Sequence, residues 1–300
     1  MSSIYIFGYE DAGKTSLMVQ IWEFLAFLKM INKKEKLTRF KLNVSHGINV
    51  TVSYDIQLID ICDSYTIEIL ASGGSMKQKD ACEHRDRLLK DACSLRNKRE
   101  PIVIVIDPLV LYPSRFMEKY RIDPSKLQRM QNNARMLLEE VIAKLKERNA
   151  YRRKIHILIN KGDIISDRDP SEIISRARKY LSNLIRRYFS DIDENQIGYY
   201  VTSAIIGALE HEVLYEKFRR TPIIQFQPEH RRAKSIVMQS IRQNSRIRSE
   251  LIEKLSNPRI REYIINGIRS ILNLAPRIER LRITDKTYVE FLDWFLQQIE

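Results

Sequence analysis

The chain has 300 residues and a formal net charge of +13, from 51 Lys and Arg against 38 Asp and Glu. This length suits one large α/β domain or a domain with an appendage, and no apolar run reaches the roughly eighteen residues of a membrane-spanning helix. Three cysteines, an odd number in a long chain, do not make a disulfide framework and indicate a reducing cytoplasm. No secretory leader is expected, because a predicted core strand begins almost at Met1. The positive charge indicates either a basic patch for an anionic partner or the surface ion networks of a heat-adapted protein.

The clearest motif lies near the N-terminus. Residues 8–15 read GYEDAGKT and fit the phosphate-binding loop G-x-x-x-x-G-K-[ST]. The apolar residues 3–7 predict a buried strand before it, and residues 16–22 open an amphipathic helix after it. Glycines permit close approach of the backbone to a phosphate, and the loop amides and helix N-terminus direct partial positive charge at it. The predicted phosphate-binding residues are Gly8, Tyr9, Glu10, Asp11, Ala12, Gly13, Lys14, Thr15 and Ser16.

Two side chains of this loop have predicted roles in chemistry. Lys14 is expected to bridge the β- and γ-phosphates as the catalytic cation. The hydroxyl of Thr15 is expected to bind Mg²⁺.

The next part of the chain predicts a hairpin. A first helix should run to about residue 31, and residues 47–59 alternate between apolar and polar side chains, as a strand does. Residues 65–70 read as the second arm of the hairpin and should supply an antiparallel edge strand. A charged helix is expected over residues 77–96.

Two continuously apolar runs, 102–106 and 155–159, predict central parallel strands that are covered on both faces. Helices are expected between and after them, over residues 124–145 and 170–189, and a last strand over 197–201. Alternating strands and helices predict an α/β fold with a mostly parallel six-stranded sheet, one antiparallel edge strand and helices on both faces.

A second motif follows the strand at 155–159. Asn160-Lys161-Gly162-Asp163 fits N-K-x-D at the carboxyl end of a buried strand, where ligands bind in such sheets. A carboxylate there can accept hydrogen bonds from guanine N1 and the exocyclic amine, and a lysine stem can cover one face of the base. After the last strand, a backbone amide can reach guanine O6. The predicted guanine-binding residues are Asn160, Lys161, Asp163, Ser203 and Ala204.

With these motifs in register, residues 3–205 resemble a Ras-like P-loop GTPase, and the Arf/Sar branch looks closest. Residues 45–50 (SHGINV) look like the Arf segment T-I-G-F-N-V, residues 71–74 (ASGG) like D-V-G-G, and residues 103–107 (VIVID) like the strand that ends in V-V-D. The resemblance implies that the chain binds GTP or GDP with Mg²⁺. It also implies that Ser45 is a second metal ligand and that the Gly74 amide contacts the γ-phosphate.

Two positions depart from the family pattern. Ala71 stands where the family has the aspartate that holds a metal-bound water, and Ser75 stands at the catalytic glutamine position. The resemblance therefore implies weaker metal retention and slow hydrolysis. Three functions stay open: a molecular switch with slow or partner-stimulated GTP hydrolysis, a pseudo-GTPase scaffold that binds GTP without turnover, and an ATPase that uses Asp107 as a Walker B carboxylate.

The C-terminal third exceeds a minimal GTPase. Residues 231–255 predict a basic helix and 260–274 an amphipathic one, while 287–296 resemble the closing helix of a GTPase. We therefore predict a G domain of residues 1–205 and 286–300, with a basic helical insertion or extension at 206–285. Alternatively, residues 208–218 close the domain and the remainder is an appended module. A protein effector or regulator is the expected partner, an anionic membrane surface is the second option, and nucleic acid is disfavoured because no aromatic side chains interleave the basic ones.

Overall fold

The computed structural model describes residues 2–9, 12–31, 40–44, 48–52, 56–60, 90, 102–147, 155–190, 197–205, 238–274 and 284–297. The predicted strand at 65–70, the predicted helix at 208–218 and the predicted helix at 77–96 apart from Lys90 lie outside these residues.

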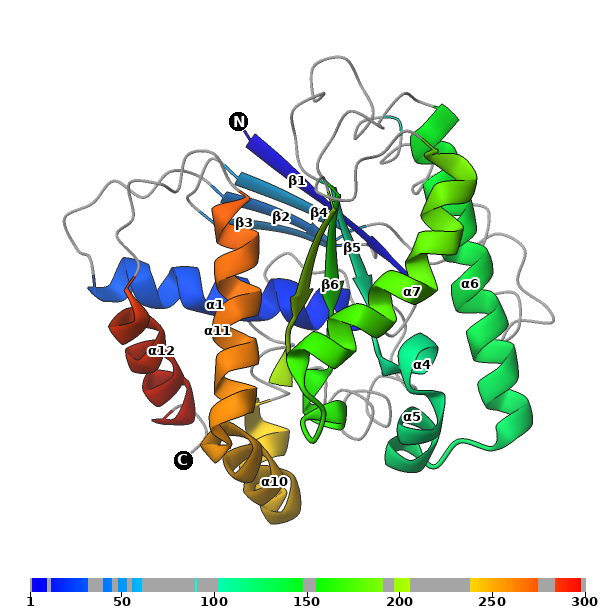
Figure 1. The fold of residues 1–300 in the computed structure, drawn as a ribbon. Coiled ribbons are helices and arrows are strands. Elements are labelled where there is room, and N and C mark those ends of the chain that lie inside the picture. Colours follow the sequence, from blue (N-terminus) through cyan, green and yellow to red (C-terminus); the bar gives the residue numbers. More distant parts are fainter. Residues whose placement is uncertain are drawn as a thin grey trace, which may run out of the picture.

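The described strands form one seven-stranded sheet in the order β3-β2-β4-β1-β5-β6-β7 (Figure 1). Their bounds are β1 Ser2–Gly8, β2 Phe40–Val44, β3 Ile48–Val52, β4 Ile56–Asp60, β5 Ile102–Ile106, β6 Ile155–Ile159 and β7 Ile197–Val201. Neighbouring strands run parallel except β2 and β3, which are antiparallel. The α/β class with a mostly parallel sheet is confirmed.

The strand count of six was wrong, and the difference lies in the early part of the chain. The strand predicted over 47–59 is two strands, β3 and β4, and a further strand, β2, precedes them. The antiparallel neighbour of β3 among the described strands is β2, and the hairpin arm predicted at 65–70 lies outside the described residues. An alternating pattern defines a strand but not its partner, so the sequence could not fix this pairing.

Helices cover both faces of the sheet (Figure 1). The helices α1 (Lys14–Ile31), α11 (Pro258–Asn273) and α12 (Asp285–Gln297) lie on one side, and α6 (Pro124–Glu147) and α7 (Pro170–Tyr188) on the other. Four shorter elements gather toward the carboxyl ends of β5 and β6: α4 (Pro108–Leu111), α5 (Pro113–Tyr120), the 3-10 helix η3 (Gly162–Ile165) and α10 (Ser245–Ser256).

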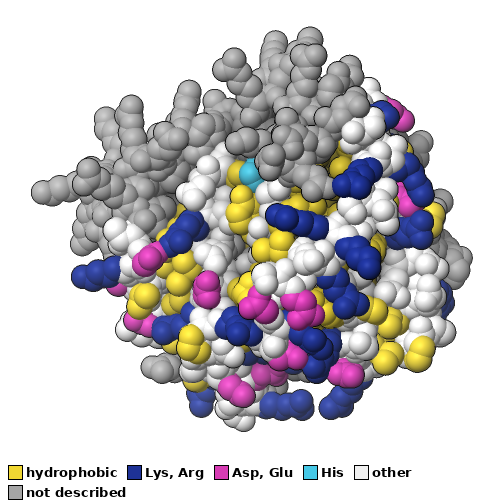
Figure 2. Space-filling model, viewed as in Figure 1, with side chains coloured by type: hydrophobic (Ala, Val, Ile, Leu, Met, Phe, Trp, Pro, Cys, Tyr) yellow, Lys and Arg dark blue, Asp and Glu magenta, His cyan; other side chains and the backbone are white. Residues whose placement is uncertain are grey.

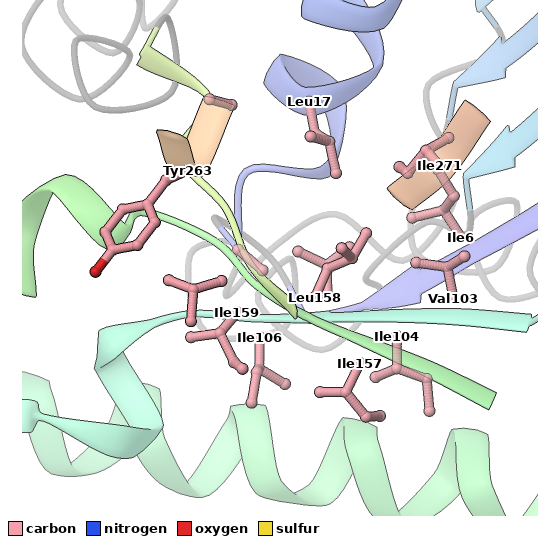
Figure 3. Packing of buried hydrophobic residues seen from close by; sticks show 14 of the residues in the cluster. Ile6, Leu17, Val103, Ile104, Ile106, Ile157, Leu158, Ile159, Tyr263 and Ile271 are labelled. Carbon is pink, nitrogen blue, oxygen red and sulfur yellow. The ribbon is translucent and has the colours of Figure 1, made fainter. Parts of the chain in front are cut away.

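The central strands explain their apolar runs. Every residue of β5 and β6 is buried. Ile104 and Ile106 point toward α6, whereas Val103 and Leu158 point toward the face that α1 and α11 cover (Figure 3). A strand that is covered on both faces has no position where a polar side chain reaches water, and so it reads as continuously apolar.

The bounds of most predicted helices are confirmed. The predicted cap of α7 is confirmed too, because Asp169 Oδ1 accepts from Ser171 N at 2.8 Å. The continuous helix predicted to residue 255 was wrong. The helix breaks at Asn244, where Oδ1 accepts from Ile247 N at 3.2 Å and caps α10. An Asn side chain competes for backbone donors in this way and so starts helices better than it continues them.

Two C-terminal helices are packed into the α/β unit. Phe24 of α1 stacks on Tyr288 of α12 with ring centroids 5.0 Å apart and meets Phe291 edge-on at 5.3 Å. α11, which lies within the predicted insertion, contacts β7 and α1 directly. No helix among the described residues is both long and apolar enough to cross a membrane.

Candidate functional site

The loop between β1 and α1 has the backbone that a phosphate-binding loop needs. Gly13 has φ +84°, in the left-handed region that favours glycine, and α1 begins at the next residue. The side chain of Lys14 is buried, and its Nζ donates to the carbonyl oxygen of Tyr9 at 2.8 Å. The ammonium therefore lies over the loop at the N-terminal end of α1.

Ser16 lies two residues after Lys14 on α1. It is 1% exposed in the first turn of α1, and its Oγ has no hydrogen-bond partner within the described ranges. A buried hydroxyl without a protein partner at a helix N-terminus suits an anion that accepts its hydrogen. The phosphate group implied by the motif fits this position.

Several predicted site residues lie outside the described part of the chain. These are Glu10, Asp11, Ser45, Gly74 and Ser75. Thr15 is the second residue of α1, but its side chain is not among those described. Their assigned roles in metal binding, phosphate binding and catalysis stay predictions.

Asn160 connects the two motifs. It directly follows β6 and is fully buried, and its Nδ2 donates to the carbonyl oxygen of Ala12 at 2.9 Å. Its Oδ1 accepts from the backbone amide of Ala204 at 3.1 Å. One side chain thus joins the phosphate loop, the N-K-G-D segment and the turn after β7, and the predicted phosphate-binding and guanine-binding segments meet at one edge of the sheet.

Lys161 points beneath the phosphate loop. Its backbone is left-handed, with φ +56°, and its Nζ lies 2.9 Å from Oδ2 of Asp107, with both side chains buried. The rings of Phe116 and Tyr120 face the ammonium, with centroids at 5.2 and 5.4 Å. A buried lysine is tolerated only when its charge is compensated, and here a carboxylate and two aromatic faces do so.

Asp107 also binds the loop itself. Its Oδ1 accepts from the hydroxyl of Tyr9 at 2.6 Å and from Leu109 N at 2.9 Å, while its own amide donates to Tyr9 Oη at 2.7 Å. Burial and the neighbouring Asp107 charge raise the pKa of Tyr9 well above its ordinary value, so the phenol keeps its proton. Both oxygens of the predicted Walker B carboxylate are therefore engaged inside the protein.

Asp163, the predicted guanine acceptor, is hydrogen-bonded on both oxygens. Oδ1 accepts from Ser203 Oγ at 2.8 Å, so the fold brings these two predicted guanine-binding residues together. Oδ2 accepts from Lys254 Nζ at 3.1 Å. Sequence reasoning missed Lys254, because a lysine on a basic helix carries no local sign that it reaches a distant loop.

Lys254 belongs to a short charge chain between α10 and α5. Its Nζ lies 3.3 Å from Glu250, and Glu250 in turn lies 2.5 Å from Lys119. Burial alone lowers the pKa of Lys254, but the charges of Asp163 and Glu250 outweigh it and raise the pKa above its ordinary value. Lys254 therefore stays charged at the loop that carries Asp163.

α11 packs against the neighbouring loop without space between them. A Cβ added at Gly267 would lie 2.7 Å from the Cβ of Thr202, the residue before Ser203. The chain from 238 to 274 thus contacts the predicted base-binding loops through both α10 and α11.

The described residues hold no group of three or more His, Cys, Asp or Glu side chains that could bind a metal ion. Figure 2 shows acidic and basic side chains interspersed near α10 and α12, whereas Lys and Arg predominate over α7. The exposed basic residues of α7 are Arg176, Arg178, Lys179, Arg186 and Arg187.

Neither a protein-family model nor a curated protein matches this chain. Among solved structures, a GTP-binding protein from the hyperthermophilic archaeon Sulfolobus solfataricus in complex with GDP is 19% identical, with a TM-score of 0.32. That match covers 73% of this chain and 51% of the archaeal one, so it spans about half of that protein. A mutant NFeoB of S. thermophilus bound to GDP is 15% identical over 100% of this chain and 98% of its own, with a TM-score of 0.32. The cytosolic domain of the T. maritima FeoB iron transporter in its GMPPNP form is 14% identical over 99% and 98%, with a TM-score of 0.29.

Proposed function

We propose that this chain binds GTP and GDP at the carboxyl edge of its sheet and acts as a molecular switch with slow or partner-stimulated hydrolysis. The bridge that Asn160 makes from Ala12 to Ala204 carries this proposal. A guanine nucleotide must contact a phosphate loop and a base-recognising carboxylate together. The bridge fixes the two segments relative to each other, so they need not be brought together when the ligand binds.

The proposed phosphate site depends on the left-handed Gly13, the buried Lys14 and the hydroxyl of Ser16, which has no hydrogen-bond partner among the described residues. Thr15, with Ser45, would hold Mg²⁺, which neutralises phosphate charge when it is bound. Lys14 contributes the fixed positive charge of the protein itself.

The base end rests on Asp163. Its carboxylate can accept from guanine N1 and the exocyclic amine, whereas adenine has no donor at N1. The stem of Lys161 would cover one face of the base. An ATPase that uses Asp107 gains no support, because Tyr9, Leu109 and Lys161 already engage both carboxylate oxygens.

The wider assignments belong to the same proposal. Membership of the Arf/Sar branch rests on the sequence resemblance alone. The packing of α12 on α1 supports a G domain that residues 286–300 close, with 206–285 as the segment that carries α10 and α11. A protein effector or regulator in the cytoplasm is the proposed partner.

Base specificity is tested with Asp163→Asn. We expect wild type to prefer GDP over ADP in calorimetric titrations with Mg²⁺, and the variant to lose about tenfold or more in GDP affinity. Because an amide can pair with the 2-oxo group of xanthine, the variant should gain affinity for xanthosine diphosphate. Asp167→Asn, at an exposed position, is the matched control. Unchanged GDP affinity together with no gain for xanthosine diphosphate would overturn the proposal.

Turnover separates the switch from the pseudo-GTPase scaffold that Ala71 and Ser75 suggest. We expect slow single-turnover GTP hydrolysis by wild type, abolished in Lys14→Ala. GTP that stays intact over many hours on wild type, with normal binding, would favour the scaffold.

A further inference from the structure

The carboxylate assigned to base recognition is already bound within the chain. Both oxygens of Asp163 carry hydrogen bonds, from Ser203 Oγ and Lys254 Nζ, and its side chain is 0% exposed. A base therefore cannot contact this carboxylate unless a group that covers it moves. Lys254, which comes from a separate helix, is a group that can leave without unfolding the loop.

The chemistry of Lys254 matches that of the ligand. Guanine would present N–H donors to Asp163, and an ammonium presents N–H donors with a full positive charge. The lysine thus compensates the buried carboxylate as the base would, and each is a substitute for the other.

Lys254 also has a second partner to which it can move. Glu250 lies one turn earlier on α10, 3.3 Å from Lys254 Nζ and held by Lys119 of α5. If Lys254 leaves Asp163, its charge stays paired with Glu250 near the surface, where its side chain is already 14% exposed. The exchange therefore leaves the ammonium paired and the buried carboxylate hydrogen-bonded by the neutral N–H groups of the base.

We propose that Lys254 is an intramolecular competitor for the guanine base, so that nucleotide binding releases α10 from the base-binding loop. This inference rests on the proposed guanine site and adds its regulation. The apparent nucleotide affinity is the intrinsic affinity multiplied by the fraction of molecules in which Lys254 is not docked on Asp163. Conversely, the nucleotide shifts α10 toward its released position by the same coupling. A partner protein would then recognise the nucleotide-bound state by contacting α10.

The test compares Lys254→Met with Arg246→Met, an exposed cation on the same helix. We expect Lys254→Met to bind GDP about tenfold or more tightly than wild type, and Arg246→Met to match wild type. Pyrophosphate, which needs the phosphate loop but not the base site, should bind wild type and Lys254→Met equally. Lys254→Arg, which keeps the charge and the donors, should restore the weaker GDP affinity.

A second measurement uses the wild-type chain. Hydrogen exchange of residues 245–256, followed by mass spectrometry, should become faster when GDP is added. Equal GDP affinity of the two Met variants with unchanged exchange in GDP-bound wild type would overturn the competition while leaving the guanine site intact. Pyrophosphate binding without GDP binding in every variant would overturn the guanine site and the competition together. If Lys254→Met does not fold, the exchange of wild type decides alone.

Discussion

Lys161 Nζ lies 2.9 Å from Asp107 Oδ2, and the two side chains are 1% and 0% exposed. This ion pair supports the phosphate loop, since the same aspartate also accepts a hydrogen bond from the hydroxyl of Tyr9 in that loop. The backbone of Lys161 is left-handed, with φ +56°, and its buried side chain reaches Asp107 beside the loop. The loop therefore rests on charges and hydrogen bonds as well as on apolar packing.

Removing Asp107 should be costly. Asp107→Ala leaves the Lys161 ammonium buried without its carboxylate, and we expect a loss of about 3–5 kcal/mol in the free energy of unfolding. Urea denaturation measures this loss. Asp167→Ala removes an exposed ion pair with Arg115 and should cost at most about 1 kcal/mol. Losses of equal size in the two variants would contradict the role given to the buried pair.

Removing the Tyr9 hydroxyl tests the hydrogen bonds between Tyr9 and Asp107. Tyr9→Phe leaves the Asp107 amide without its partner and removes one of the two hydrogen bonds to Asp107 Oδ1, which keeps the one from Leu109 N, so we expect a loss of about 1–3 kcal/mol in urea denaturation. Tyr263→Phe is the control, because the Tyr263 hydroxyl is buried without a hydrogen-bond partner among the described residues. A loss in the control as large as that in Tyr9→Phe would argue against the hydrogen bonds as the cause.

The close contact between α11 and the turn after β7 can be tested at Gly267. Gly267→Ala places a methyl group against Thr202, and we expect a loss of about 1–3 kcal/mol from overpacking. Asn266→Ala, at the preceding and less buried position, should leave the unfolding midpoint nearly unchanged. Equal midpoints in both variants would mean that α11 shifts away without cost.

The charge chain between α5 and α10 predicts a pH dependence at Glu250. Burial acts to raise its pKa, but Lys119 and Lys254 outweigh burial, so the folded pKa lies below the ordinary 4.5. Its stabilisation is present above that ordinary value and is lost as the pH falls through the folded pKa. The difference in unfolding free energy between wild type and Glu250→Gln should therefore shrink as the pH falls from 7 toward 3.

The exposed Glu253 of α10 provides the control for that titration. The difference between wild type and Glu253→Gln should stay small throughout the same pH range. A gap for Glu250→Gln that stays constant or widens in acid would contradict the ion-pair assignment.

The fold could be predicted where contiguous sequence patterns define an element, and it could not be predicted where contacts join residues distant in the sequence. The runs in β5 and β6 and the motif at Asn160 are contiguous, so composition and order alone locate them. The contacts of Lys254 with Asp163 and of Tyr9 with Asp107 join residues that are distant in the sequence. An exposed lysine and one that reaches a buried carboxylate look alike on a helix, so no pattern separated them.

The aromatic contact between α1 and α12 has a consequence for how the protein is made. Phe24 is synthesised long before Tyr288 and Phe291, which pack against it. During translation the aromatic face of α1 therefore stays uncovered until α12 has been made, and it can associate with other nascent chains in that time. Pairing elements so far apart in the chain also slows folding. The position of α12 in the chain thus leaves the aromatic face of α1 exposed for most of synthesis.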